Sequence, residues 1–174
     1  MAKILDVKDD NALKAAIDLG IAMQLTNISR DVMEDTGNNR FYISKNFSKE
    51  NLRDELLEQT NEYYLIYYKN KVAGFSKVIF NSPNENIDGI NITKMERLYL
   101  LKEYYGLGLG LELFNFNVTL SKKNHQRGLW LEVWIENLRA IAFYTKIGLK
   151  KTGLYNFKVS ETHSNPNYVM FQEY

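Results

Sequence analysis

The stretch Trp130–Lys150 constrains the fold most, because its hydrophobic period changes from that of a strand to that of a helix. Its first half alternates two sets of side chains, as a strand does: one set is Leu131, Val133 and Ile135, and the other is Trp130, Glu132 and Trp134. In its second half, four residues recur at i, i+3, i+4 and i+7 on one helix face: Asn137, Ala140, Ile141 and Tyr144. The sequence therefore predicts a buried strand that leads directly into a helix.

Two residues mark the predicted ends of that helix. Glu136 is expected in the first turn, where a negative charge suits the helix dipole, and Gly148 stands where the helix would stop. The helix then carries an amide, Asn137, and a phenol, Tyr144, on the same side. Such a pair can hold a polar ligand and give or take a proton.

Composition excludes several classes of function. The 174 residues, with 45% apolar and 25% charged, favour a single domain spanning residues 1–174. The net charge of +1 gives no basic field for a nucleic-acid partner, and the absence of cysteine excludes disulfides and thiolate chemistry. No apolar run is long enough for a membrane span, and the N-terminus is too charged for a signal peptide. A cytoplasmic enzyme or binding domain is expected.

The order of predicted elements indicates a mixed-sheet α/β domain. Strands are expected over Lys3–Val7, Glu62–Tyr68, Lys71–Phe80, Ile92–Leu101, Lys150–Val159 and Tyr168–Glu173, besides the one that begins at Trp130. Helices are expected from Asp10 or Asn11 to about Ser29, over Ser48–Leu57 and over Leu111–Lys123. Loops are expected over Asn81–Gly89 and Glu161–Asn167, and Gly74 is a possible bulge or point of close approach.

Three glycines, Gly106, Gly108 and Gly110, lie between a predicted strand and a predicted helix. Glycines in this position let backbone N–H groups approach a phosphate, and the helix N-terminus adds partial positive charge. The alternative is a tight turn in an apolar run. The spacing fits neither a dinucleotide-binding fingerprint nor a Walker loop.

Glu96 lies on the strand before this turn. If it is partly buried, its pKa would be raised and it could act as a general base; if it is exposed, it would pair with Lys94 or Arg97. His125 and His163 lie in polar loop segments and are interpreted as solvated. No metal site is predicted.

The motif LEVWIENLRAIAFYTKIGL resembles the GCN5-related N-acetyltransferases, the GNAT family, whose pattern has L-x-V, N, A and F-Y-x-x-x-G-F in that order. MERLYL resembles that family's strand before the cofactor loop, and FSKENLRDELLEQTNEYYLIYYKNKVAGF resembles the polyamine-acetylating members. The resemblance covers about residues 47–174 and leaves residues 1–46 as an atypical helical part. It implies a mixed, mostly antiparallel sheet of about seven strands, splayed between the fourth and fifth.

The resemblance also implies a function, which is acetyl transfer from acetyl-CoA to a small primary amine by direct attack. The resemblance implies that Tyr144 would protonate the leaving thiolate and that Glu96 would take the proton of the amine through water. The cofactor-binding residues it implies are Leu98, Tyr99, Leu100, Gly106, Leu107, Gly108, Leu109, Gly110, Leu111, Asn137 and Tyr144. The partners expected are a small-molecule amine and at most a second copy of the chain, as monomer or homodimer.

One departure from the family pattern concerns the glycine loop. Tyr105 replaces the usual Gln or Arg, and Leu107, Leu109 and Leu111 replace polar or basic neighbours. The backbone cradle is kept while side-chain charge is lost. Weaker cofactor binding is expected, or compensation by one of three lysines, Lys102, Lys122 or Lys146.

A second resemblance is confined to DLGIAMQLTNISRDVMEDTGNNRFYI, residues 18–43, which is similar to the diphosphate-binding helix of squalene and phytoene synthases. That all-helical fold needs several hundred residues and a second Asp-rich helix, so a diphosphate site here is disfavoured. Asp31, Glu34 and Asp35 are a solvated face or an attraction for a cationic amine. Two other functions stay open for the whole chain: acetylation of a protein or peptide α-amine, and non-catalytic acyl-CoA sensing.

Overall fold

The computed structural model describes residues 2–6, 14–15, 60–158 and 164–174. Its strands are β1 (Ala2–Asp6), β2 (Asn61–Tyr68), β3 (Lys71–Ile79), β4 (Thr93–Leu100), β5 (Gly128–Trp134), β6 (Lys150–Lys158) and β7 (Ser164–Glu173). Its helices are the short η1 (Lys102–Tyr104), α3 (Leu109–Lys123) and α4 (Leu138–Lys146). Apart from residues 14 and 15, which are helical, the helices predicted before residue 60 lie outside the described residues.

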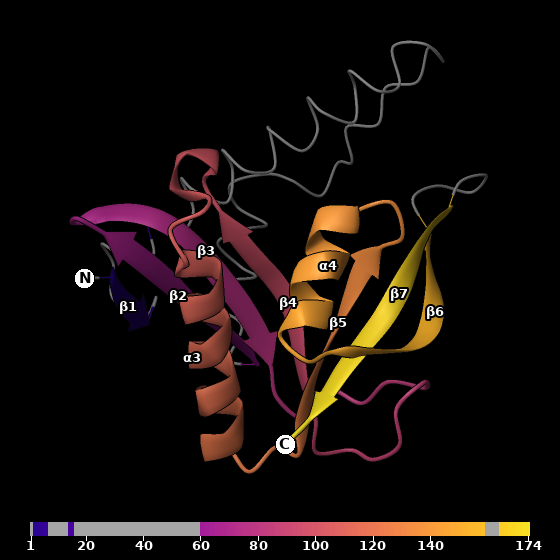
Figure 1. Ribbon diagram of the computed structural model, residues 1–174. Coiled ribbons are helices and arrows are strands. Elements are labelled where there is room, and N and C mark those ends of the chain that lie inside the picture. Colours follow the sequence, from indigo (N-terminus) through magenta and orange to yellow (C-terminus); the bar gives the residue numbers. More distant parts are fainter. Residues whose placement is uncertain (1, 7–13, 16–59, 159–163) are drawn as a thin grey trace. The chain divides into compact units, whose positions relative to one another are not determined.

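The strands form a seven-stranded sheet in the order β1-β2-β3-β4-β5-β7-β6 (Figure 1). Pairing is antiparallel for β1 with β2, β5 with β7 and β6 with β7, and parallel for β4 with β5. The parallel ladder holds two residue pairs, Thr93 with Leu129 and Lys94 with Trp130. The predicted mixed sheet with a splay between its fourth and fifth strands is confirmed.

The described residues fall into two compact units, and the boundaries between them pass through β3, β4 and α3. The first unit takes in the described residues up to Lys77 together with Leu98–Leu113. One of its core clusters joins the sheet to the start of α3 and contains the buried residues Ile66, Ala73, Leu109 and Leu113. A second cluster contains Tyr63, Leu65 and Phe75. The prediction of a single domain over residues 1–174 stays a prediction.

The second unit takes in Val78–Arg97 and Phe114–Tyr174. Here α3 is held to β4 by a buried pair of hydroxyls, because Thr93 Oγ1 and Ser121 Oγ lie 2.7 Å apart. The ring of Phe114 in α3 meets the rings of Phe143 and Tyr144 in α4, each with centroids 6.5 Å apart. These contacts fix the face of α4 that carries Tyr144.

The end of α4 explains why Gly148 stands where it does. Gly148 has a φ of +102°, its N–H donates to the carbonyl of Thr145 at 3.1 Å, and the N–H of Leu149 donates to the carbonyl of Tyr144 at 3.0 Å. This pair of hydrogen bonds is a Schellman motif, and Leu149 is buried beyond it. The predicted helix end is confirmed.

Several predicted boundaries differ from those of the structure, and three of the differences have a clear physical reason. Glu136 lies before the helix, because the side chain of Asn137 caps α4 by accepting from the N–H of Ala140 at 3.1 Å. The helix α3 begins at Leu109 and so includes Gly110, which a helix tolerates. Strand β7 begins at Ser164, because its polar residues up to Asn167 pair with β6.

Gly74 is a point of close approach, as the sequence predicts. A Cβ placed there would overlap the carbonyl oxygen of Tyr99 and the side chain of Leu100 on the neighbouring strand β4. The two backbones can approach this closely only because residue 74 has no side chain.

We expect Gly74→Ala to lower the free energy of unfolding by about 1–3 kcal/mol, the usual range for overpacking. Urea unfolding of the two proteins measures the difference. Lys71→Ala, at an exposed position of the same strand, is the control and should change stability little. Equal stability of Gly74→Ala and the parent would show that β3 and β4 are not in close contact at this point.

Candidate functional site

The turn between β4 and α3 is open around two of its glycines. Gly106 and Gly108 have φ values of +81° and +78°, and nothing lies within 4 Å of a Cβ built on either. The carbonyl of Gly108 accepts the first hydrogen bond of α3, from the N–H of Glu112 at 3.1 Å. The N–H groups of the preceding residues have no partner within the helix and carry its positive dipole end. This open backbone cradle fits a diphosphate.

The strand before this turn presents backbone groups at its edge away from β3. The N–H of Leu101 donates to the carbonyl of Ala73 on β3 at 2.9 Å. Because backbone groups alternate in direction along a strand, those of Leu98 and Leu100 point to the opposite edge. There they can pair with an extended amide chain such as a pantetheine arm.

Tyr99 is placed differently from its two neighbours. Its carbonyl lies beside Gly74 on β3, and its ring meets the ring of Phe75 edge-on with centroids 5.4 Å apart. Both the backbone and the side chain of Tyr99 are therefore directed at β3 and the core cluster of Tyr63, Leu65 and Phe75. The geometry favours Leu98 and Leu100 over Tyr99 as partners of a cofactor.

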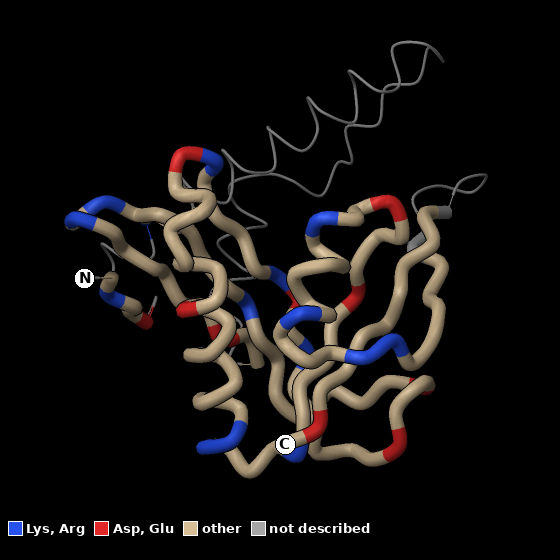
Figure 2. Tube along the Cα trace, viewed as in Figure 1, with Lys and Arg blue, Asp and Glu red and all other residues tan. Residues whose placement is uncertain are grey.

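The exposed side chains around the glycine turn are largely apolar, as expected from a sequence that has leucines there in place of basic residues. Tyr105, Leu107 and Leu111 are 43%, 50% and 43% exposed, whereas Leu109 is buried in the core. Among the lysines considered as compensation, Lys102 lies in η1, directly before the turn (Figure 2). Lys122 lies about 16 Å further along α3 than Leu111 and stacks on Tyr174, so it cannot serve the turn. Lys146 lies in the last turn of α4.

Tyr144 and Asn137 both belong to α4 in the second unit. The ring of Tyr144 is partly buried against Phe143 and Phe114, with centroids 5.3 and 6.5 Å away, so its position is set by aromatic packing. Asn137 uses its Oδ1 to cap α4 and keeps its Nδ2 as a donor. The phenol and the amide can thus each offer a proton or a hydrogen bond from a fixed helix.

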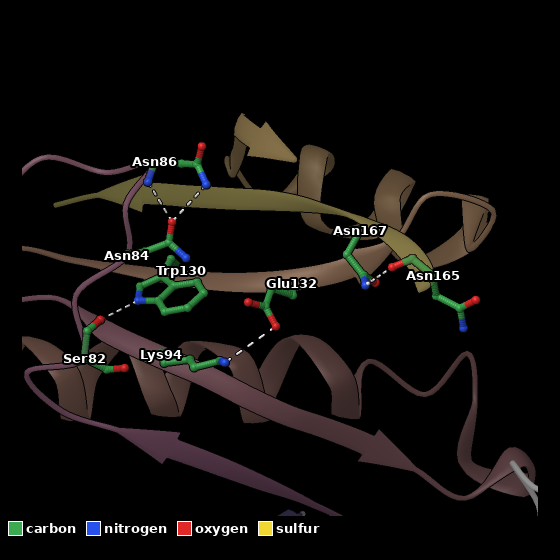
Figure 3. Close-up of polar contacts among 8 residues, drawn as sticks. All are labelled: Ser82, Asn84, Asn86, Lys94, Trp130, Glu132, Asn165 and Asn167. Atoms are coloured by element: carbon green, nitrogen blue, oxygen red, sulfur yellow. Dashed lines mark hydrogen bonds and ion pairs between the residues drawn. The ribbon is translucent and has the colours of Figure 1, made fainter. Parts of the chain in front are cut away.

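Glu96 is exposed, which is the second of the two environments that the sequence allows for it. Its neighbour on the strand, Lys94, has its Nζ 3.5 Å from an oxygen of Glu132 and 4.9 Å from the ring centre of Trp130 (Figure 3). The side chains of Lys94 and Glu132 are both 21% exposed. A second carboxylate, Glu132, therefore lies on the face that Lys94 and Trp130 share.

Sequence reasoning missed Glu132 as a site residue. The alternation along β5 gives its face, but only the register of β4 against β5 shows that Lys94 lies beside it. Because residues two apart on a strand share a face, Glu96 lies on the same face as Lys94. The sheet thus carries two carboxylates, on neighbouring strands, that could accept a proton from an amine.

The loop over Asn81–Gly89 is tied to the second unit by buried polar contacts. Gln126 donates to the Oδ1 of Asn81 at 2.9 Å and accepts from its backbone N–H at 3.0 Å. The indole N–H of Trp130 donates to the carbonyl of Ser82 at 2.7 Å (Figure 3). Within the described residues, no helix could cross a membrane and no three His, Asp or Glu side chains gather as a metal site would need.

Two kinds of relatives match this chain. An uncharacterized N-acetyltransferase of Lactobacillus delbrueckii subsp. lactis is 31% identical over 111 residues, which are 63% of this chain and 64% of that protein. A 15-cis-phytoene synthase of Enterobacter agglomerans is 28% identical over 107 residues, which are 60% of this chain and 36% of that protein. The chain thus spans less than two thirds of the length of either relative.

The family model of squalene/phytoene synthase matches residues 1–78. This is a longer match than the segment 18–43 noted in the sequence. The described residues of that range from Asn61 onward form β2 and β3, and Ala2–Asp6 form β1. These residues therefore take part in a sheet, where the all-helical fold of that family would have none.

Solved structures match over nearly the whole chain. The ribosomal-protein-S18-alanine N-acetyltransferase of Escherichia coli has a TM-score of 0.66 and 17% identity, and covers 99% of this chain and 94% of its own. The PaiA N-acetyltransferase of Thermoplasma acidophilum, in complex with coenzyme A, has a TM-score of 0.64 and 19% identity, and covers 100% of this chain and 99% of its own. The chain therefore has the fold of the GNAT acetyltransferases.

Proposed function

We propose that this chain transfers the acetyl group of acetyl-CoA to a primary amine. The observation that carries the proposal is the open turn at Gly106 and Gly108, which leads into the N-terminus of α3. It stands directly after a strand whose backbone groups at Leu98 and Leu100 point away from β3. A diphosphate with an extended amide arm needs these two features in this order.

Acetyl-CoA supplies the activated acetyl group as a thioester. The N–H groups from Gly106 to Leu111 would hold its diphosphate, and the backbone of Leu98 and Leu100 would align its pantetheine arm. Tyr144 would donate a proton to the leaving sulfur, and the amide of Asn137 would bond the cofactor arm. The contribution of these residues is positioning and proton transfer, without a covalent bond to the enzyme.

The acceptor that we propose is a small amine, with polyamines as the first class to test. The polyamine assignment rests on the resemblance of residues 47–75 to members that acetylate such amines. Glu96 and Glu132 would favour a cationic amine electrostatically and provide a base for its proton. We assign the base to Glu96, as the family resemblance implies, because Glu96 is exposed to water, through which it could take the proton of the amine.

A non-catalytic acyl-CoA sensor is the second candidate. The exposed Leu107 and Leu111, where charged side chains would strengthen cofactor binding, favour it. The decisive experiment measures thiol release from acetyl-CoA with spermidine and with a peptide bearing a free α-amine, beside CoA binding by calorimetry. Binding without turnover on either amine would support the sensor, and no binding at millimolar CoA would refute both functions.

Tyr144→Phe should lower kcat by about a hundredfold or more, the range of a general acid, and weaken CoA binding far less than it lowers kcat. The variant keeps the ring that packs on Phe114 and Phe143, so the fold should be kept. Steady-state kinetics and calorimetry give the two quantities. A kcat like that of the parent would exclude Tyr144 as the acid.

Glu96→Gln should lower kcat at least tenfold, because glutamine cannot accept the proton of the attacking amine. Glu132→Gln is the matched variant on the neighbouring strand. The assignment is wrong if only Glu132→Gln lowers kcat, and the base is then Glu132.

Asn137→Ala should lower the free energy of unfolding by about 0.5–2 kcal/mol, because it removes the cap of α4. Asn137→Ser keeps a capping oxygen but loses the amide donor, so it should keep most of the stability. Both variants should weaken CoA binding if the amide bonds the cofactor arm. Full CoA affinity in Asn137→Ser would leave Asn137 with the capping role alone.

A further inference from the structure

The turn between β2 and β3 holds a lysine against an aromatic ring. Lys69 and Asn70 form the turn with φ values of +50° and +61°, as in the tight turns that join antiparallel strands. Lys69 Nζ lies 5.5 Å from the ring centre of Tyr68. The turn geometry and the cation–π contact together direct an otherwise long and mobile side chain.

Tyr68 in turn packs beside the start of α3. Its ring meets the ring of Tyr104 edge-on, with centroids 6.1 Å apart. Both tyrosines pack against the core cluster that contains Leu109, the first residue of α3. Two aromatic contacts therefore link Lys69 through Tyr68 to Tyr104, which comes two residues before Gly106 in the sequence.

A second lysine, Lys102, lies in the short helix that precedes the glycine turn. It belongs to η1, and the N–H of Tyr105 donates to its carbonyl at 3.1 Å. Figure 2 shows the basic residues at the β2–β3 turn and the basic and acidic residues of η1. Lys69 and Lys102 are both exposed, and the acidic residues nearest in sequence to the turn are Glu103 and Glu112.

Coenzyme A carries two separate phosphate groups, a diphosphate and a 3′-phosphate on its ribose. The backbone cradle offers N–H groups for one compact group, the diphosphate. A phosphate monoester adds about −1.5 to −2 charges at neutral pH and needs cations of its own. The turn itself has none, since Tyr105, Leu107 and Leu111 occupy its exposed positions.

We propose that Lys69 and Lys102 bind the 3′-phosphate of coenzyme A. This inference rests on the proposed function, because it takes coenzyme A as the ligand of the glycine turn. Lysine suits the role as a point charge that tolerates several phosphate orientations. The hairpin turn would then be part of the cofactor site, which no sequence motif indicates.

The test compares coenzyme A with 3′-dephospho-coenzyme A, which keeps the diphosphate and the pantetheine arm. Calorimetric titration of the full chain would be made with the parent, Lys69→Gln and Lys102→Gln. Each variant should bind coenzyme A about two- to fivefold more weakly, as expected for a solvent-exposed charge pair. Affinity for the dephospho ligand should not change, and Glu103→Gln should strengthen binding of coenzyme A only.

The matched control is Lys122→Gln, which makes the same charge change on α3 but at its far end, where the lysine stacks on Tyr174. It should bind both ligands like the parent. Equal weakening for the two ligands in Lys69→Gln and Lys102→Gln would overturn the proposal, and so would a parent protein that does not distinguish them. Binding of neither ligand would overturn the proposed function as well, whereas normal selectivity without turnover would contradict catalysis alone.

Discussion

The backbone of β4 is the constraint on which the proposed site depends. Two backbone groups at the end of β4 contact β3. The N–H of Leu101 donates to the carbonyl of Ala73, and the carbonyl of Tyr99 lies beside Gly74. Alternation then leaves the groups of Leu98 and Leu100 for the other edge. Among the described residues, the parallel ladder with β5 pairs Thr93 and Lys94 of β4. A strand with one edge satisfied and the other open over its last residues can bind an extended ligand as a strand would.

The strand–helix unit from Trp130 to Lys150 could be predicted from sequence because its signals are local. Period change, cap and terminal glycine all act within a few residues, and the structure has β5, α4 and the Schellman end in those places. The predicted start of the helix was wrong because a local contact determines it. The side chain of Asn137 caps the helix, so Glu136 lies before its first turn. The seven-stranded fold followed from element order and the resemblance together.

The contacts of the site that could not be predicted from the sequence are those between elements far apart in the chain. Lys94 meets Glu132 because of the register between two strands that are far apart in the chain. Lys69 is linked to Tyr104, just before the glycine turn in the sequence, because Tyr68 and Tyr104 pack together although they come from different elements. Neither contact leaves a periodic or spaced pattern in the sequence. The first 78 residues show the converse, since a local sequence likeness to phytoene synthases includes residues that form strands of the sheet.

The leucines of the glycine turn determine which groups are left to bind the phosphates of a cofactor. Backbone N–H groups act at hydrogen-bond distance and lose little when side chains around them become apolar, so the cradle at Gly106 and Gly108 is kept. What the substitution removes is the mobile positive charge that would meet a second phosphate. If Lys69 and Lys102 supply it, recognition of the diphosphate and of the 3′-phosphate is divided between backbone dipoles and side chains of different elements. The diphosphate contacts would then give affinity for many nucleotides, and selectivity for coenzyme A would depend on the β2–β3 turn and η1.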